Sequence, residues 1–482
     1  MKTYDLIIVG MGPSGIFCAY ELIKHNKASN ILLIEQGKRI ENRMCPMEKL
    51  GKCVKCKPFC NITCGFSGAG AFSDGKLNSY HLSLHNQNGD FYLGGNGGGY
   101  IKKYMQTQDI KDLLAYTDNI YLEFGADKHL HGIMHRDEIL KLQSKAKQNG
   151  LDLVDFPIRH LGTEKAHILY TKIEKFLEDN NVNMLFNTEV QDLIIEEGAI
   201  EGVKVKNVLT GEEEIIRGKD VVLGVGRKGA GWLSEICRKH GIETQVGSVD
   251  LGIRYELPDS VMKEVNKYMY EGKFIGRPKP FEDRVRTFCQ NPSGFVSAEV
   301  YDNGLTLVNG HSYKDRKSDN TNLSILVSHN FNYPFNKPIE YGQNIAENVN
   351  RLAAGGVLVQ RFGDILSGKR TWEKDLEINS VVPTLKGAVA GDITYAIGYR
   401  TMTEIINFIK QVDKVVPGFA GKDNLLYAPE IKFYSNIVVV DKNFETNIKN
   451  LFCIGDGGGL TTGLMMASAS GVQVARNLIA KN

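Results

Sequence analysis

The chain has 482 residues, of which 42% are hydrophobic and 24% are charged, a composition typical of a globular protein with two or three domains. Its 58 basic and 56 acidic residues leave a formal charge of only +2. The surface as a whole is therefore not expected to bind nucleic acid or an anionic membrane. Nine cysteines, an odd number, do not form a secreted disulfide framework, and no apolar run is long enough to span a membrane, so we expect a cytoplasmic protein.

The N-terminal segment predicts a nucleotide-binding βαβ unit. Residues 4–9 read as a buried strand, and Gly10, Gly12 and Gly15 follow before a helical pattern and a second strand that ends near Glu35. In such a unit the first glycine permits the tight turn, the second lets the backbone approach a pyrophosphate, and the third lets helix and strand pack closely. The helix N-terminus receives the phosphate charge, and Glu35 would accept hydrogen bonds from a ribose. This pattern predicts that the chain binds a dinucleotide, but it does not show whether that dinucleotide is FAD or NAD.

Five of the nine cysteines follow within residues 45–64, far more than an even distribution would place there. Four of them, Cys53, Cys56, Cys60 and Cys64, have the spacing C-x2-C-x3-C-x3-C, which leaves three chemistries open. Four thiolates could hold zinc or an iron–sulfur cluster, although the spacing differs from common ferredoxin and zinc patterns. The last two could instead form a redox-active dithiol. The third alternative is a tight loop in which the thiols are small buried hydrophobes.

A glycine-rich stretch, GFSGAGAFSDGKL at 65–77, comes directly after the cysteines. Its glycines would let backbone N–H groups approach an anion, and Lys76 at its end could neutralise the charge of that anion. The stretch therefore extends the predicted phosphate-binding surface.

A second glycine turn at Gly224, Gly226 and Gly229 follows residues 183–219, which read as short alternating strands of a β-meander. The turn could open an independent NAD(P)H domain, but the meander favours its return to the first sheet. Arg227 and Lys228 in this turn could bind a phosphate of a reductant or simply be solvated. NAD(P)H, if it is used, would then bind transiently.

The C-terminal segment separates FAD from NAD. It predicts a short strand, a turn from Gly455 to Gly459 that contains Asp456, and a helix of small residues from about Gly463. The segment resembles the closing segment of flavoproteins of the glutathione-reductase superfamily, in which the aspartate binds the ribityl chain. A helix N-terminus at the pyrimidine end of the flavin would stabilise the negative charge of reduced flavin. Both ends of the chain together therefore indicate one FAD.

Several motifs together resemble the family of uncharacterised FAD-dependent dehydrogenases over essentially the whole chain. They are residues 65–77, VDLGIRYE at 249–256, VRTFCQNPSG at 285–294, VNGHSY at 308–313, LLYAPEIKFYS at 425–435 and the C-terminal turn. The resemblance implies an oxidoreductase without naming its substrate, and a two-domain flavoprotein with a para-hydroxybenzoate-hydroxylase-like layout. Ser67 departs from the family, which usually has glycine at this position.

The expected fold class is α/β. A discontinuous Rossmann-like FAD-binding domain is expected in 1–90, 151–250 and 416–482, with an excursion at 91–150, and a mixed α+β substrate domain in 251–415.

The candidate residues fall into three groups. Candidate cofactor-binding residues are Gly10, Gly12, Pro13, Ser14, Gly15, Glu35, Gln36, Arg43, Gly68, Ala69, Gly70, Ser73, Asp74, Gly75, Lys76, Val190, Gly226, Arg227, Gly455, Asp456 and Gly463. Candidate catalytic residues are His311, Arg286, Lys432 and Tyr434, with Arg254 and Glu430 as further polar candidates. Candidate metal ligands are Cys53, Cys56, Cys60 and Cys64. His311 would serve as a proton donor because an imidazole titrates near neutral pH.

These expectations describe an FAD-dependent oxidoreductase that moves a hydride between flavin N5 and a small organic metabolite. One alternative is a flavin electron-transfer module in which an iron–sulfur or dithiol relay in the cysteine loop serves a redox partner protein. A non-enzymatic flavin redox sensor is a further alternative. No nucleic-acid partner and no membrane span are expected.

Overall fold

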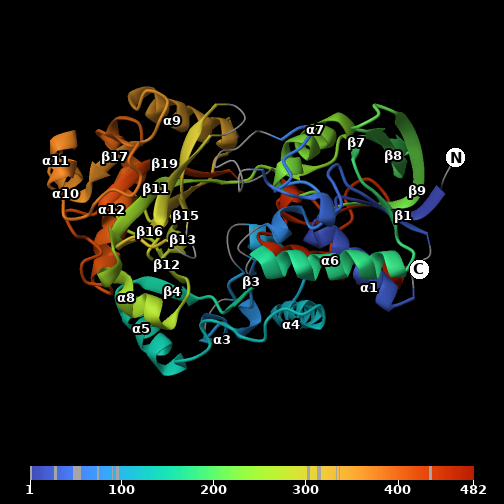
Figure 1. The fold of residues 1–482 in the computed structure, drawn as a ribbon, viewed down its shortest axis with the longest axis horizontal. Coiled ribbons are helices and arrows are strands. Elements are labelled where there is room, and N and C mark those ends of the chain that lie inside the picture. Colours follow the sequence, from blue (N-terminus) through green and yellow to red (C-terminus); the bar gives the residue numbers. More distant parts are fainter. Residues whose placement is uncertain are drawn as a thin grey trace.

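The computed structural model describes residues 3–26, 30–46, 56–72, 75–88, 91–93, 97–161, 163–300, 304–311, 316–332, 334–335, 337–433 and 437–481. Its two largest sheets lie in two lobes, and both ends of the chain belong to the lobe of the first sheet (Figure 1). No helix in these ranges combines the length and the apolar character that a membrane span needs.

The first sheet has the order β6-β2-β1-β9-β8-β7, and β21 pairs with β9. Its strands are β1 (Thr3–Val9), β2 (Ile31–Ile34), β6 (Asn183–Leu185), β7 (Thr188–Glu196), β8 (Ala199–Asn207), β9 (Glu213–Leu223) and β21 (Leu451–Cys453). β1, β2, β6, the end of β9 and β21 are parallel, whereas β7, β8 and the start of β9 form an antiparallel meander. The prediction that the meander returns to the first sheet is confirmed.

Helices cover this sheet because its parallel strands are apolar on both faces. They include α1 (Pro13–Lys24), α4 (Thr107–Glu123), α6 (Thr163–Asp179), α7 (Ala230–His240) and α13 (Leu464–Lys481). α1 and α13 pack at very short range, since a Cβ on Gly471 would lie 2.1 Å from the Ser14 carbonyl oxygen. Buried Glu21 joins three helices by accepting hydrogen bonds from Tyr116 and Arg476.

The second sheet has the order β18-β17-β19-β11-β16-β13-β12-β4. Its strands are β4 (Leu151–Asp155), β11 (Val249–Pro258), β12 (Gly272–Gly276), β13 (Val285–Asn291), β16 (Asn320–His329), β17 (Leu358–Arg361), β18 (Val389–Ala390) and β19 (Leu425–Phe433). Every pairing except that of β17 with β18 is antiparallel. Strict alternation in β11 puts Ile253, Tyr255 and Leu257 on an apolar face.

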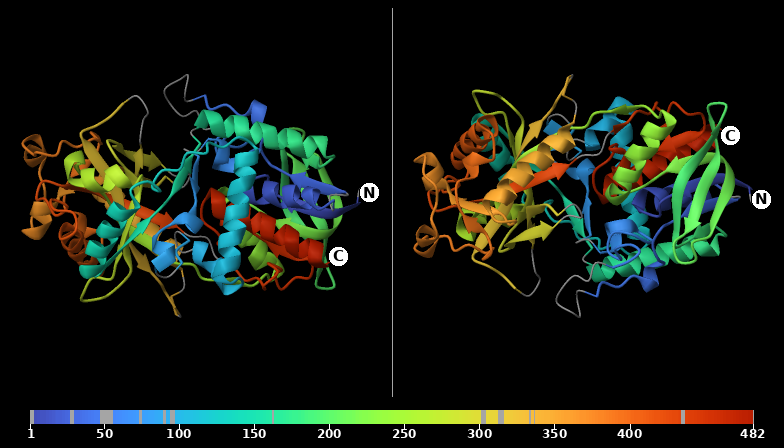
Figure 2. Two further views of the ribbon diagram at one scale, coloured as in Figure 1. Left: turned by 90° about the horizontal axis from the view of Figure 1, so that it is seen from below. Right: turned by 90° about the horizontal axis from the view of Figure 1, so that it is seen from above.

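Helices and hairpins complete the second lobe. They include α5 (Arg136–Gln148), α8 (Asp259–Tyr268), α9 (Pro338–Leu352), α10 (Phe362–Leu366), α11 (Glu373–Glu377), α12 (Tyr399–Asp413) and the hairpin of β14 (Phe295–Val300) with β15 (Thr306–His311). Between the lobes, β3 (Lys76–Asn78) pairs with β5 (Ile158–His160) (Figures 1 and 2).

The chain passes between the two lobes more often than the predicted domain boundaries imply. Residues 151–155 were expected in the first domain, but they form β4, which pairs with β12 in the second sheet. The expected excursion at 91–150 is divided, because α4 packs on α13 of the first lobe and α5 packs on β4 of the second. Such pairings join residues far apart in the sequence, so local patterns do not reveal them.

Candidate functional site

Three glycine turns meet at the carboxyl ends of the parallel strands β1, β9 and β21. A Cβ on Gly10 would lie 2.8 Å from the Gly224 oxygen, and a Cβ on Gly457 would lie 2.4 Å from the Val225 oxygen. The Ser14 hydroxyl donates a hydrogen bond to the same Gly224 oxygen at 3.2 Å. Ligands of open α/β sheets bind outside the carboxyl ends of the strands, so these turns mark a binding edge.

The first turn fits a pyrophosphate. A Cβ on Gly15 would lie 2.1 Å from the Gly10 oxygen, whereas a Cβ on Gly12 would meet nothing within 4 Å. Gly12 is the N-cap of α1 and provides no side-chain cap, and Pro13 at the next position has no N–H group. The start of α1 therefore presents its remaining N–H groups and the positive end of its dipole to open space, as an anion site requires.

Glu35 holds the backbone around the predicted ribose site. Its carboxylate accepts hydrogen bonds from the N–H groups of Met11 at 3.0 Å, Gly37 at 2.9 Å and Gly65 at 2.8 Å. A carboxylate offers about four acceptor positions, so one remains for a ribose hydroxyl. Gln36 beside it donates to the Cys64 sulfur at 3.1 Å.

Asp456 begins the short 3-10 turn 456–458 that precedes α13. Its carboxylate accepts hydrogen bonds from the Thr461 hydroxyl at 2.7 Å and the Gly463 N–H at 3.1 Å, and Arg227 Nε lies 3.9 Å from it. These contacts fix the carboxylate where the third turn enters the helix. Gly463 has a φ of +89° and open space at its Cβ position, so a side chain is excluded there by backbone conformation rather than by crowding.

The glycine-rich stretch runs beside the first turn. A Cβ on Gly68 would lie 3.4 Å from the Gly12 Cα, and Lys76 at the start of β3 has its Nζ 5.0 Å from the centre of the Tyr270 ring. Ser67 has a φ of +73°, a left-handed conformation that explains why glycine is usual at this position in the family that the chain resembles. Ser73 and Asp74 lie outside the described residues.

Most of the remaining cofactor candidates belong to the glycine turns or to the glycine-rich stretch, whereas Val190 belongs to β7. Ala69 and Gly70 belong to the short 3-10 helix of residues 68–71, Gly75 directly precedes β3, and Gly226 and Gly455 lie in the second and third turns. Val190 is buried in β7, where it pairs with Val205 of β8.

Arg43 organises the loop rather than presenting a charge to a ligand. The guanidinium is buried and donates hydrogen bonds to the carbonyl oxygens of residues 61, 62, 66 and 68 and to the Ser67 hydroxyl. Arginine has five N–H groups, so these five acceptors use all of them. Burial lowers the pKa of Arg43 to about 10. The sequence predicts that Arg43 contacts the cofactor directly. In the structure, however, no N–H group of its guanidinium is left to donate a hydrogen bond to a cofactor.

Replacing Arg43 with Met is expected to open the loop at 61–68. The loss in stability should be about 2 kcal/mol, because the freed carbonyls can be hydrated once the loop opens. Hydrogen exchange followed by mass spectrometry should show lower protection in this loop alone. Arg39→Met, which removes a half-exposed arginine paired with Glu174 and Glu178, is the control and should leave the loop protected. Unchanged protection in Arg43→Met would contradict the role assigned to this side chain.

Cys60 and Cys64 lie on one helical turn, since the Cys64 N–H donates to the Cys60 oxygen at 3.0 Å. Burial works to raise the pKa of the Cys60 thiol, but N–H groups of Ile62 and Thr63 bond to its sulfur and the pKa falls below its usual value. Burial raises the pKa of Cys64. Cys53 lies outside the described residues, and within them no three His, Cys, Asp or Glu side chains are arranged to hold a metal ion. The four-cysteine metal site thus stays a prediction.

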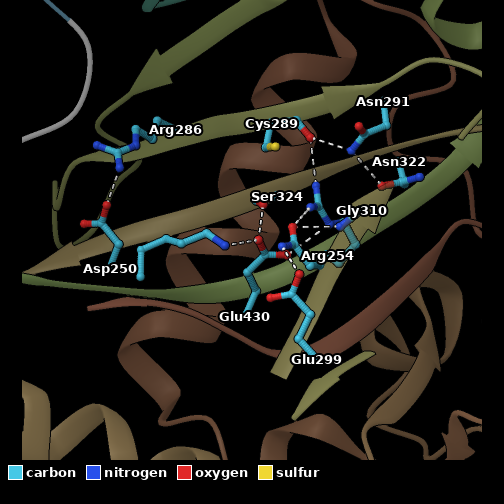
Figure 3. Close-up of polar contacts among 12 residues, drawn as sticks. Asp250, Arg254, Arg286, Cys289, Asn291, Glu299, Gly310, Asn322, Ser324 and Glu430 are labelled. Carbon is cyan, nitrogen blue, oxygen red and sulfur yellow. Dashed lines mark hydrogen bonds and ion pairs between the residues drawn. The ribbon is translucent and has the colours of Figure 1, made fainter. Parts of the chain in front are cut away.

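The second sheet carries buried charges on one face, which we call the polar face (Figure 3). Its members are Asp250, Arg254, Glu256, Lys273, Arg286, Asn322, Ser324, Glu430 and Lys432. They alternate along their strands with the residues of the apolar face, and across the strands Asp250 pairs with Lys432 and Arg254 with Ser324. Period-two alternation of this kind gives a sheet two faces of different character.

Arg254 and Glu430 form the centre of the polar face. Arg254 Nε lies 3.0 Å from Glu430 Oε2, and both side chains are fully buried. The same guanidinium donates to the Cys289 carbonyl and to Asn309, and Glu430 accepts from Ser324 at 2.5 Å. A buried ion pair needs such additional bonds to offset its desolvation.

The structure brings two of the catalytic candidates onto this face. Arg286 pairs with Asp250, and Lys432 Nζ lies 3.1 Å from Glu430 Oε1. Burial works to lower the pKa of Lys432, but the Glu430 carboxylate raises it above its usual value, so this side chain is a cation rather than a base. His311 is exposed at the end of β15, one residue beyond Gly310, which packs against Arg254. Tyr434 lies outside the described residues.

Contacts across β3 connect the polar face with the glycine turns. Tyr80, just after β3, packs edge-to-face on Phe156 with ring centres 5.7 Å apart, and Phe156 in turn lies 4.4 Å from Lys273 Nζ. Burial is the largest cause of the raised pKa of Tyr80, and the charge of Asp456 contributes to it. The turns and the polar face therefore belong to one junction between the lobes. Sequence reasoning missed Lys273, although it is the polar residue in the alternating segment GKFIG.

Comparison with known proteins agrees with a flavoprotein assignment. Residues 262–432 match the family described as FAD-dependent protein, C-terminal domain-like. This part of the chain is similar to the C-terminal domain of FAD-dependent proteins, and the match supports FAD as the cofactor. An uncharacterized protein of Clostridium beijerinckii is 24% identical over 98% of this chain and 80% of its own length.

Among solved structures, the chain is similar to the quinol fumarate reductase FrdA of E. coli, with 14% identity over 100% of this chain and 72% of that chain and a TM-score of 0.40. L-proline dehydrogenase from P. horikoshii gives 13% identity over 100% of this chain and 94% of that chain, with a TM-score of 0.38. The glycerol-3-phosphate dehydrogenase of Bacillus halodurans complexed with FAD gives 11% identity over 100% of this chain and 64% of that chain, with a TM-score of 0.36. Similarities at this level carry no argument about activity.

Proposed function

We propose that this protein is an FAD-dependent oxidoreductase of the glutathione-reductase-like superfamily that moves a hydride between the flavin and a small organic metabolite. The observation that carries the proposal is the meeting of three glycine turns around the open, uncapped start of α1. A para-hydroxybenzoate-hydroxylase-like layout, with the second sheet covering the flavin, is part of the proposal and is supported by the contacts across β3.

The residues of the first lobe would hold the cofactor in distinct ways. The start of α1 at Gly12 would bind the pyrophosphate, Glu35 would accept a hydrogen bond from the adenosine ribose, and Asp456 would orient the ribityl chain. Bound FAD would supply hydride transfer at N5. The N-terminus of α13, whose preceding residue Gly463 donates its N–H to Asp456, would stabilise negative charge on the reduced ring.

The residues of the polar face would bind and orient the substrate. Lys432 and Arg286 carry positive charge into a face whose other members are buried, so that water is largely excluded there. Each is held by a carboxylate, Glu430 for Lys432 and Asp250 for Arg286, which positions the cation before a substrate arrives.

Anaerobic purification followed by an absorption spectrum and metal analysis tests this function. We expect a yellow protein with a flavin band near 450 nm and about one FAD per chain. Bleaching by NADPH without a partner would identify a reductant. Iron and acid-labile sulfide in the same sample would instead favour the relay alternative, to which the Cys60–Cys64 turn belongs. A colourless protein that refuses added FAD would refute the proposal.

Asp456→Ala is expected to lower FAD affinity about 10- to 100-fold, because hydrogen bonds that involve a charged group contribute about 1.5–3 kcal/mol. Equilibrium titration with FAD, followed by flavin fluorescence, measures the change. Asp5→Ala is the matched control, because Asp5 lies near the amino end of β1, opposite the turns, and pairs with Lys219 on the surface. Equal losses in the two variants would contradict the role given to Asp456.

A further inference from the structure

Lys273 on β12 is an unusual buried cation. Its side chain is 4% exposed, and its ammonium lies 4.4 Å from the Phe156 ring centre, 5.1 Å from that of Phe288 and 5.6 Å from that of Tyr92. Within the described part of the chain, no carboxylate pairs with this ammonium and no hydrogen bond is made by it. Aromatic faces attract a cation, but they do not replace the counter-ion that a buried charge requires.

Two arginines lie around the same aromatic rings. Arg284 donates a hydrogen bond to the Tyr92 hydroxyl at 3.4 Å, and the Arg286 guanidinium lies 5.6 Å from the Phe288 ring centre and pairs with Asp250. We call Lys273, Arg284 and Arg286 the cationic cluster.

The electrostatic effect of the cluster is visible at Tyr92. Burial works to raise the pKa of this phenol, yet Lys273, Arg286 and Arg284 lower the pKa below its usual value. Other titratable groups near this region include His329, which is bonded to Thr401, and Asp283, which is bonded to Arg400. Glu271, two residues before Lys273, is a further carboxylate in this region, and after burial its charge contributes to raising the pKa of Tyr80.

The cluster lies at the junction where a substrate would meet the flavin. Phe156 bridges Lys273 and Tyr80, and Tyr80 lies just after β3. Tyr270, three residues before Lys273, lies under the ammonium of Lys76 from the glycine-rich stretch. The cationic cluster thus lies beside the β3 region, which continues from the glycine-rich stretch.

We infer that the cationic cluster binds the carboxylate group of an organic substrate, with Lys273 as the residue that determines specificity for the anion. The inference rests on the proposed function, because it places this carboxylate beside the flavin. A carboxylate would supply the counter-ion that Lys273 lacks in the described structure. The rings of Phe156, Phe288 and Tyr92 would pack against the apolar body of the substrate.

A matched pair of ligands tests this inference on the FAD-loaded protein. Benzoate combines a carboxylate with an apolar body, benzamide is its neutral isostere, and inorganic phosphate is an anion without an apolar body. Binding is followed by perturbation of the flavin absorption band and, independently, by the shift in Tm. We expect benzoate to bind and perturb both, and benzamide and phosphate to bind at least tenfold more weakly.

Two lysine variants separate the cluster from general effects of charge. Lys273→Met should weaken benzoate binding at least tenfold, whereas Lys267→Met should change it less than twofold, because Lys267 is an exposed lysine on α8 whose ammonium lies 5.0 Å from the centre of the Tyr268 ring. The Tm of ligand-free Lys273→Met should be equal to or above that of the parent protein, since a buried charge without a counter-ion is removed. Arg284→Met is the second cluster variant and should also weaken benzoate binding.

The inference would be overturned if benzoate and benzamide bound equally well. It would also be overturned if the folded Lys273→Met variant bound benzoate as well as the parent protein does. If the protein bound phosphate in a manner that depends on Lys273 but did not bind benzoate, the ligand of the cluster would not be a carboxylate. A protein that refuses FAD would refute the proposed function instead, and the benzoate-dependent Tm shift of that protein would still test the cluster. The two failures are therefore distinguishable.

Discussion

The variant Gly12→Glu is expected to fold and to lose FAD. Gly12 has extended backbone dihedrals of −77° and 179° that any residue can adopt, and a Cβ there meets nothing within 4 Å, so the apoprotein should keep its stability. The new carboxylate would lie where the pyrophosphate binds. Two like charges about 4 Å apart repel by about 4 kcal/mol at an effective dielectric constant near 20, which corresponds to a loss of FAD affinity of roughly a thousandfold.

The measurement compares bound FAD per chain and the Tm of the apoprotein. Gly398→Glu is the matched control, because Gly398 is likewise the N-cap of a helix, α12 in the second lobe, and also has open space around its Cβ position. That variant should remain yellow. Full retention of FAD in Gly12→Glu would show that the start of α1 is not the phosphate site and would remove the main support for the proposed function.

The variant Arg254→Met is expected to destabilise the second lobe by about 3–5 kcal/mol. The substitution leaves Glu430 buried without its closest guanidinium partner, and breaking a buried pair from one side has this cost. Urea unfolding should show the loss as a lower midpoint. The double variant Arg254→Met with Glu430→Gln should recover part of the loss, because it removes both charges of the pair.

Arg351→Met provides the comparison for this prediction. Arg351 pairs with Glu347 on the exposed side of α9, so its removal should cost less than about 1 kcal/mol. If Arg254→Met were no more destabilising than Arg351→Met, the central pair of the polar face would be dispensable for the fold. A catalytic explanation for its charges would then become stronger than a structural one.

Much of the first lobe could be predicted from the sequence because its signals are local. The apolar run 4–9, the glycine spacing that follows it and the small-residue helix at the C-terminus each specify an element within a short window. The meander could be recognised for the same reason. Gly12, Glu35 and Asp456 then follow from the known geometry of such units, and the structure places all three at the binding edge.

The roles of Arg43 and Lys273 could not be predicted in this way. An arginine near a cofactor motif looks like a phosphate ligand, and only the folded loop shows that carbonyl groups between residues 61 and 68 use its donors. The sequence around Lys273 contains no motif at all. Its burial becomes evident only when rings contributed by residues 92, 156 and 288 are brought around it.

The sequence by itself determined the βαβ unit with its glycine turn and the strand by which the meander returns to the first sheet, because turn geometry and hydrophobic period act over neighbouring residues. The tertiary structure alone decided that β4 joins the second sheet and which charges are paired. It also decided that, among the described residues, Lys273 is a buried cation without a paired carboxylate. These properties depend on contacts between distant segments and on the exclusion of water from the junction, neither of which a local pattern contains.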